Sequence, residues 1–234
     1  MPSFIVIPMP PKLYSKDKFL DTVKRMSIFD DSAALKQGTI PDSVVSIAEA
    51  IGFQYAYEFE QEIQTLKGPV RVRPYKTIPV VLAKSGALLA GSANKEEEER
   101  VMRFIEANFA PRTILQRMRF EQKLLRKIID TYHEVAQVEV VPSTEKSIDK
   151  LSATGRGVTA SKFWDEYGGE ELLKVKTPLS DLPEPPMVGF KEKGVVTLYG
   201  RSLEFAQQVE VLSFVAGKII AQYSRELAFQ ITLR

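Results

Sequence analysis

The sequence predicts an α+β protein built from two related halves, each ending in a β-hairpin followed by an amphipathic helix. Stretches with apolar residues at every second position alternate with stretches of helical spacing. The order of hairpin and then helix occurs twice along the chain. With 44% hydrophobic and 26% charged residues over 234 positions, the composition is that of a folded globule.

The first half begins with an expected strand at Ser3–Met9 and a helix at Asp17–Phe29, where Phe19 and Val23 follow helical spacing. A second helix is expected from Pro41 through Val44, Val45, Ile47 and Ala48 to Gly52. Proline at an early helical position and an acid in the first turn both suit a helix N-terminus.

From Phe53 the apolar period changes to two, which predicts a strand with Phe53, Tyr55, Tyr57 and Phe59 on one face. Four large rings on one face favour burial in the core. The alternative is an exposed platform on which bases stack. The segments expected next are strands at Val70–Arg73, Val80–Ala83 and Ala87–Ala90, and a helix capped by Asn94 with Glu97 three residues later.

A basic helix is expected from Arg112 to Tyr132, with Leu115, Met118, Leu125 and Ile128 among its apolar residues. The second half then restarts with a strand. Its expected elements are a strand at Gln137–Val141, helical candidates around Ile148 and at Phe163–Tyr167, a strand at Leu172–Lys176, a hairpin of Met187–Lys191 with Val195–Tyr199, and a helix capped by Ser202.

The two hairpin-and-helix stretches align with each other. Laying VVLAKSGALLAGSANKEE over VGFKEKGVVTLYGRSLEF places Gly86 on Gly194 and Asn94 on Ser202, and upstream Arg71–Arg73 falls on Lys174–Lys176. Self-similarity of this kind indicates an internal repeat. We therefore expect a first repeat at 1–110, a basic connecting helix at 111–135 and a second repeat with a C-terminal helix at 136–234.

The stretch RVRPYKTIPVVLAKSGALLAGSANKEEEE resembles the central part of the TATA-box-binding protein family. The resemblance is carried by a basic alternating strand, a Lys-Thr turn, a Ser-Gly turn and an acid-capped helix, at Arg71, Arg73, Lys76, Thr77, Ser85, Gly86, Glu96 and Glu97. It implies two repeats forming a curved antiparallel sheet with helices on one face. Members of that family bind the DNA minor groove with the sheet and insert aromatic wedges that kink the duplex.

The sequence departs from the family at the wedge positions. Ala83 stands where the first hairpin carries a wedge, while the equivalent position of the second half falls near Phe190. Alanine is too short to separate stacked bases. The resemblance therefore implies nucleic-acid binding that is not TATA-specific.

Four cations alternate along the two aligned strands: Arg71 and Arg73 in the first half, Lys174 and Lys176 in the second. On one sheet surface they would neutralise phosphates and support sequence-independent, salt-sensitive binding. The alternative is that they are ordinary solvent-facing positions paired with Glu58 or Glu60.

The expected basic helix adds Arg119, Lys123 and Arg126 as candidate contacts to nucleic acid or to an acidic partner. The alternative is that these residues form the charged outer face of a packed helix. Under either interpretation the candidates are long cationic side chains, whose roles depend on which face of the helix is buried.

Several chemistries lack the residues that they require. The chain has no cysteine and a single histidine, His133, and GRGVTASK at 155–162 lacks the glycine that precedes lysine in a phosphate loop. No cofactor or metal site is expected. No apolar run approaches the roughly 20 residues of a membrane-spanning helix, so no membrane association is expected and a cytoplasmic location is the default.

The net charge of +2 makes any attraction to nucleic acid a matter of local patches. The sequence therefore predicts a non-enzymatic nucleic-acid-binding protein. The alternative is a protein-interaction or regulatory subunit on the same scaffold that does not bind nucleic acid. An enzyme using His133 with a carboxylate is the least favoured interpretation.

Overall fold

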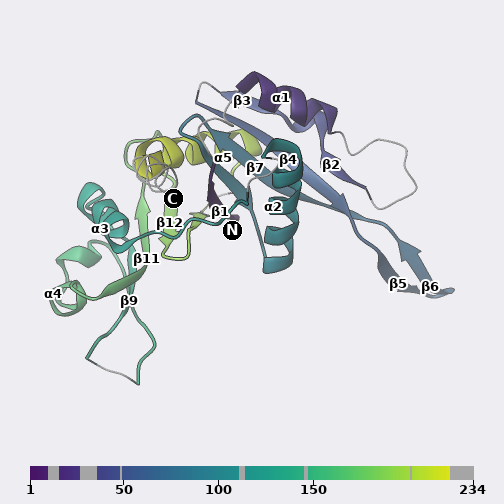
Figure 1. Cartoon of the computed structure of the whole chain (residues 1–234). Coiled ribbons are helices and arrows are strands. Elements are labelled where there is room, and N and C mark those ends of the chain that lie inside the picture. The colour runs from purple at the N-terminus through teal and green to yellow at the C-terminus, as the bar shows by residue number, and fades with distance from the viewer. Residues whose placement is uncertain are drawn as a thin grey trace. The chain divides into compact units, whose positions relative to one another are not determined.

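The computed structural model has the predicted α+β class, with large antiparallel sheet structure and few helices (Figure 1). It describes residues 1–9, 16–26, 36–47, 49–110, 114–144, 147–200 and 202–221. The expected end of the first helix at Phe29 and the expected start of the basic helix at Arg112 lie outside these residues. No helix in the described part of the chain is both long enough and apolar enough to cross a membrane.

Two compact units share the chain in an interleaved way. Unit 1 consists of Met1–Ile7 and Gln116–Ser202, and unit 2 of Pro8–Leu115 and Leu203–Arg234. The N-terminal strand thus belongs with the second half of the sequence, and the C-terminal helix with the first half. The sequence repeats expected at 1–110 and 136–234 remain a prediction, because compactness does not test duplication.

Unit 1 is built on an antiparallel sheet with the order β10-β9-β11-β12-β13-β1. Its strands are β1 (Ser3–Pro8), β9 (Gln137–Val141), β10 (Leu151–Thr154), β11 (Glu171–Pro178), β12 (Met187–Lys191) and β13 (Val195–Tyr199). Its helices are α3 (Gln122–Thr131) and α4 (Lys162–Tyr167). The predicted strand at Gln137–Val141, the hairpin at 187–199 and the helix at Phe163–Tyr167 are confirmed, whereas the region around Ile148 is not helical.

The two faces of the unit 1 sheet differ in polarity, because side chains alternate along each strand. One face carries buried apolar residues, among them Val138 on β9, Val175 on β11 and Phe190 on β12, which the strand register aligns. The apolar side of α3, centred on Leu125 and Ile128, supplies further core. The opposite face is polar and lysine-bearing.

Unit 2 has the sheet order β8-β7-β4-β2, with β3 also paired to β4. Its strands are β2 (Gln37–Thr39), β3 (Val45–Ile47), β4 (Ala50–Glu58), β5 (Gln61–Thr65), β6 (Gly68–Val72), β7 (Tyr75–Ala83) and β8 (Ala87–Gly91). Its helices are α1 (Lys16–Arg25), α2 (Lys95–Phe109) and α5 (Phe205–Phe214), the last continuing as a π-helical stretch at Val215–Ile220.

An aromatic cluster fills one face of the unit 2 sheet. Phe53 and Tyr55 on β4 are fully buried. The Phe53 ring centroid lies 5.7 Å from that of Phe19 on α1, and the Tyr55 centroid lies 4.4 Å from that of Phe104 on α2. Tyr57 is also buried. The prediction that this strand face is core is therefore confirmed, and the base-stacking platform is excluded.

The second face of the unit 2 sheet is covered by α5, which packs on β4 and β7. A Cβ atom at Gly52 on β4 would lie 2.3 Å from Cγ2 of Val209, so only glycine allows this close approach. Helices therefore cover both faces of this sheet. The prediction of helices on one face is wrong for unit 2, because the apolar α5 needs a sheet surface to bury against.

The segment expected to be a second helix forms strands instead. Pro41–Ser43 makes a single 3₁₀ turn, β3 follows at Val45–Ile47, and β4 already begins at Ala50. Val44, Val45 and Ile47 are β-branched and suit a pleated sheet. Val45 pairs with Gly52 in a short hairpin, and β4 pairs along its whole length with β7, which outweighs the local helix-start signal.

The basic helix begins ten residues later than expected, at Gln122. Residues 114–121 are extended, with Met118 and Phe120 buried and Arg119 exposed. The Met118 N–H donates to the Val6 carbonyl at 2.8 Å, and the Phe120 N–H donates to the Glu192 carbonyl at 2.8 Å. These backbone hydrogen bonds, rather than the helical spacing of Leu115 and Met118, set this conformation.

The final helix is capped by a different residue from the one expected. Glu204 occupies the N-cap position of α5, and a reciprocal capping box with Gln207 satisfies the first backbone N–H groups. Ser202 lies two residues upstream of this cap. By contrast, Asn94 caps α2 as predicted, because its Oδ1 accepts the Glu97 N–H at 3.0 Å.

Candidate nucleic-acid interface

The polar face of the unit 1 sheet brings together residues from four strands. We call it the lysine face and define it by Gln137, Glu139, Lys174, Lys176, Lys191 and Tyr199. The strand register aligns Lys174 with both Glu139 and Lys191, and it aligns Lys176 with Gln137. Lys174 and Lys176 therefore share one face, as the alternation along their strand predicted.

Lys174 is the most buried member of the lysine face, with 9% of the residue exposed. Its Nζ atom lies 3.2 Å from Oε1 of Glu139 and donates to Oε1 of Gln137 at 3.1 Å. The other oxygen of Glu139 lies 3.8 Å from Nζ of Lys150. Two lysines therefore neutralise the one carboxylate on this surface.

Tyr199 connects three strands across the lysine face. Its ring covers Gly189 on β12, where an added Cβ atom would lie only 2.8 Å from a ring carbon. Nζ of Lys176 lies 4.2 Å from the ring centroid, and Nζ of Lys174 lies 5.7 Å from it. These are favourable cation–π distances, so one aromatic ring contacts two ammonium groups.

Lys191 extends the lysine face toward solvent. It is exposed and lies directly opposite Lys174 on the neighbouring strand. Lys176 and Tyr199 are half-buried. The surface thus offers two accessible ammonium groups and one tyrosine, while Lys174 balances the charge of Glu139 beneath them.

Arg71 and Arg73 are not on this sheet. Arg71 is in β6, which pairs only with β5 as a two-stranded sheet of unit 2, and Arg73 follows that strand. Arg73 forms an exposed ion pair with Glu60 at 3.4 Å. The expectation of four cations on one sheet surface is therefore wrong, because β6 and β11 occupy different places in their units.

Phe190 and Ala83, the two residues at the wedge positions, are both inside the protein. Phe190 is fully buried, with its ring centroid 6.3 Å from that of Phe120. Ala83 on β7 is 1% exposed. Neither side chain can insert between bases in this conformation. The prediction that Phe190 contacts nucleic acid is therefore wrong, because its ring is part of the core.

The cations near and on α3 differ in what they contact. Arg119 is exposed and forms an ion pair with Glu192. Lys123 is exposed on α3. Arg126 donates to the carbonyl oxygens of Gly168, Gly169 and Glu170, at 2.6, 3.1 and 2.7 Å. Arg126 therefore joins α3 to the segment that follows α4, which is a structural role.

We expect Arg126→Ala to lower the free energy of unfolding by about 1–3 kcal/mol, because three carbonyl groups lose a charged donor. Urea denaturation monitored by circular dichroism measures this change. Lys123→Ala, an exposed cation on the same helix, is the matched control and should change stability by less than about 0.5 kcal/mol. Equal stability of the two variants would contradict the structural role of Arg126.

The structure describes two segments that were considered for enzyme chemistry. The sequence GRGVTASK forms a turn and the start of α4, with Gly157 in the left-handed conformation. Beside His133, burial and the nearby Asp181 raise the pKa of Tyr132 to about 12. Among the described residues, no group of three or more His, Asp or Glu side chains is placed to hold a metal ion.

Sequence analysis did not identify four members of the lysine face: Gln137, Glu139, Lys191 and Tyr199. The alternation within Met187–Lys191 and Val195–Tyr199 does indicate that Lys191 and Tyr199 lie on the polar side of their strands. The missing information was the register between strands, which decides which polar side chains become neighbours.

The chain matches no known protein-family model and no curated protein.

Proposed function

We propose that the chain is a non-enzymatic nucleic-acid-binding protein that contacts the phosphate backbone through the lysine face of unit 1. The observation that carries this proposal is the grouping of Lys174, Lys176, Lys191 and Tyr199 on one polar sheet face. Phosphate contacts by lysine position a protein on nucleic acid without reading its sequence.

The charge balance of the lysine face supports phosphate binding. Glu139 is its one carboxylate, and both Lys174 and Lys150 lie within ion-pair distance of it. Lys176 and Lys191 are therefore left to attract anions with little repulsion from Glu139. Tyr199 adds a ring on which an unpaired base or a sugar can pack.

The family resemblance adds support from strand order. The order β8-β7-β4-β2 in unit 2 has a counterpart in β13-β12-β11-β9 of unit 1, with a helix following the hairpin in each half of the sequence. This agrees with a duplicated, TATA-box-binding-protein-like ancestor. Because Phe190 and Ala83 are buried, we propose binding without wedge insertion or sharp kinking.

The alternative function is a protein-interaction module without nucleic-acid binding. It is favoured by the β5–β6 hairpin, which continues outward from β4 and β7 (Figure 1). Ile63 and Val70 pair on one hairpin face and are 43% and 46% exposed, and Leu66 at the tip is fully exposed. An isolated two-stranded hairpin with an apolar face is stabilised when a partner covers that face.

Binding measurements at two salt concentrations test the proposal. The probes are labelled duplex and single-stranded DNA and RNA of mixed sequence. The variant K176A/K191A should bind duplex with a log–log salt slope smaller by about 2 than that of the wild type, because two phosphate contacts are lost. The matched control K84A/K95A removes two exposed lysines of unit 2 and should keep the wild-type slope.

Each other outcome of this experiment points to a different conclusion. No binding of any probe at low salt overturns the proposal, and self-association that Leu66→Lys abolishes would then support the alternative. Loss of binding in R119A or K123A but not in K176A/K191A would move the interface to α3 and the segment that precedes it. Loss confined to R71A/R73A would move it to the hairpin.

A further inference from the structure

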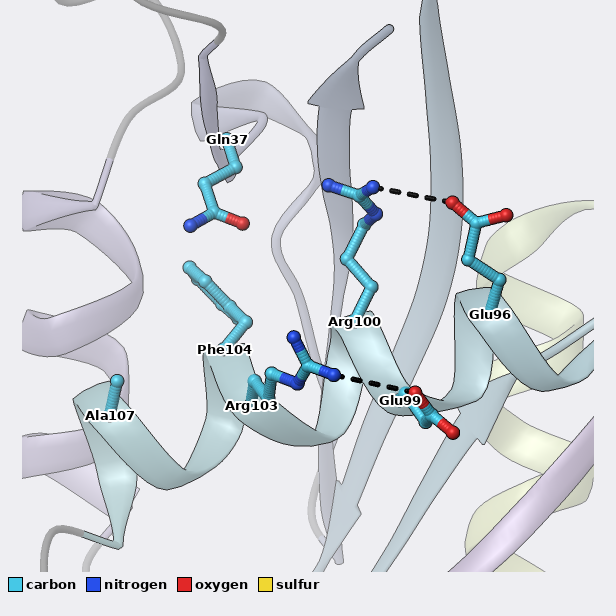
Figure 2. Close-up of a pocket in the computed structure, with 7 residues that line it drawn as sticks. All are labelled: Gln37, Glu96, Glu99, Arg100, Arg103, Phe104 and Ala107. Carbon is cyan, nitrogen blue, oxygen red and sulfur yellow. Dashed lines mark hydrogen bonds and ion pairs between the residues drawn. The ribbon is translucent and has the colours of Figure 1, made fainter.

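A concavity of unit 2 is lined by residues of β2 and α2. It has a volume of about 510 Å³. Among the described residues, its lining consists of one residue of β2 and six of α2: Gln37, Glu96, Glu99, Arg100, Arg103, Phe104 and Ala107. Figure 2 shows Gln37, Arg100 and Arg103 around the ring of Phe104.

The floor of the concavity is an aromatic pair. Phe104 is 3% exposed, and its ring centroid lies 4.4 Å from that of Tyr55 beneath it. The Tyr55 hydroxyl donates to Oε1 of Gln37 at 2.9 Å. Burial raises the pKa of Tyr55 to about 12, so this hydroxyl remains a donor at neutral pH.

This hydrogen bond orients the Gln37 amide. Because Oε1 of Gln37 accepts from Tyr55, the amide nitrogen is the group left to donate toward a ligand. The Gln37 amide lies next to the Phe104 ring (Figure 2).

Arg100 is held in place by an aromatic ring. Its guanidinium carbon lies 4.5 Å from the ring centroid of Tyr57. One terminal nitrogen lies 3.4 Å from Glu96, and Nε is buried with no hydrogen-bond partner among the described residues. A guanidinium positioned by stacking loses little further freedom when it binds an anion.

Arg103 lies one helical turn away on the same side of α2. One of its nitrogens is 3.3 Å from Glu99, and its side chain is 78% exposed. Ion pairs between exposed residues four positions apart contribute only about 0.3–0.5 kcal/mol each. Both arginines can therefore exchange these glutamates for a better-placed anion at low cost.

The three polar groups around Phe104, which are two guanidiniums and one amide nitrogen, suit a ligand that accepts hydrogen bonds rather than one that donates them. Arginine and the Gln37 amide nitrogen only donate, and a planar guanidinium matches a carboxylate in a two-bond geometry. Glu96 and Glu99 on the same lining oppose a dianion or a polyanion more than a monoanion. Ala107 is exposed and leaves apolar surface beside the charged groups, and the nearly buried Phe104 ring adds only an edge to it.

We propose that this concavity is a binding site for a monocarboxylate with an apolar body, held by Arg100, Arg103 and the Gln37 amide over the Phe104 ring. The carboxylate comes either from a free small molecule or from the C-terminus of a peptide. This site is independent of the proposed nucleic-acid function, because none of its residues belongs to unit 1.

Backbone amide NMR titrations of the full chain test the site. The probes are benzoate, inorganic phosphate, a short apolar peptide with a free C-terminus and the same peptide with a C-terminal amide. Benzoate should give saturable shift changes centred on Gln37, Arg100, Arg103 and Ala107. Arg103→Gln should weaken its binding at least about fivefold, since one charged hydrogen-bonding partner is lost.

Lys95→Gln is the matched control, because Lys95 is also an exposed α2 cation that pairs with Glu99, at 3.7 Å, but lies outside the lining. It should bind benzoate as the wild type does. If the protein binds the free peptide but not its amide, the proposal is supported and the ligand is the C-terminus of a peptide. If it binds benzoate alone, the proposal is supported and the ligand is a small molecule.

Three results would overturn the assignment. The first is the absence of a saturable shift change with both benzoate and the free peptide. The second is equal benzoate affinity of the wild type and Arg103→Gln, and the third is phosphate binding as tight as benzoate binding. Outside α2, the spectrum of Arg103→Gln should match that of the wild type, which would confirm that the variant is folded. This match is expected because the Arg103 side chain is exposed and contributes no core packing.

Discussion

Replacing Gly194 by alanine is expected to lower the free energy of unfolding by about 2–5 kcal/mol. Gly194 has a φ of +71°, a conformation that costs an L-residue roughly 1–2 kcal/mol. A Cβ atom there would also lie 1.6 Å from the carbonyl oxygen of Met118. Relieving this clash must move the 116–120 segment, at a further cost of about 1–3 kcal/mol typical of overpacking.

Gly157→Ala separates the two causes. Gly157 has a similar φ of +66° and no atom within 4 Å of the added Cβ. It should show the conformational cost alone, about 1–2 kcal/mol. Urea unfolding of both variants under identical conditions gives the comparison. Equal losses would mean that Met118 does not approach Gly194 as closely as the structure places it.

Glu97→Gln is expected to lower stability by about 2 kcal/mol at pH 7, because a nearly buried carboxylate loses charged hydrogen bonds. Its side chain is 9% exposed. Oε2 accepts the Ala93 N–H at 2.9 Å, and Oε1 accepts from Nζ of Lys76 at 3.1 Å. These contacts connect the start of α2 to β7.

The loss should depend on pH in a defined direction. Burial alone raises the pKa of Glu97, but hydrogen bonds from Ala93 and Lys76 outweigh it and hold the pKa below 4.5. A carboxyl group whose pKa is lower in the folded than in the unfolded state stabilises the fold at pH values above its unfolded-state pKa. This contribution is lost as the pH falls through the folded-state pKa. The difference between wild type and Glu97→Gln should therefore be constant above about pH 5.5 and shrink below pH 4.5.

Glu96→Gln is the control for this experiment. Glu96 also lies in the first turn of α2 and shares its helix-dipole interaction, but its side chain is 82% exposed. Its replacement should change stability by no more than about 0.5 kcal/mol. A pH-independent difference for Glu97→Gln would show that the carboxylate does not make the bonds described.

Strands with strict alternation were predictable from sequence. Gln137–Val141 and the hairpin of 187–191 with 195–199 have the predicted bounds. In each of them, the second and fourth residues are apolar and buried, and burying that one face leaves a single arrangement of the strand. The cap at Asn94 was also predictable, because a capping residue acts on its own next turn.

Segments in which local signals compete were not predictable. Pro41–Gly52 carries a helix-start signal over β-branched residues, and the pairing of Val45 with Gly52 decides in favour of strand. Likewise Leu115 and Met118 have helical spacing, but backbone hydrogen bonds to Val6 and Glu192 make the segment extended. The first outcome also depends on the pairing of β4 with β7, and the second on Val6 and Glu192, which are partners distant in sequence that a local pattern does not contain.

The candidate interface divides in the same way. The placement of Lys174 and Lys176 on one face follows from a period of two within a single strand. The separation of Arg71 and Arg73 from them does not, because aligned sequence positions do not ensure equivalent places in a sheet. β6 pairs with β5 in a separate hairpin, while β11 is central to the unit 1 sheet.

By itself the sequence determined the α+β class, most strand positions, the aromatic core face of β4 and the shared face of Lys174 and Lys176, because these depend on periodicity and on neighbours within one turn or strand. Only the tertiary structure decided that α5 covers the second face of unit 2, that Phe190 is buried and that Tyr199 joins the two lysines. These features depend on sheet order and register, which are set by burial over the whole chain.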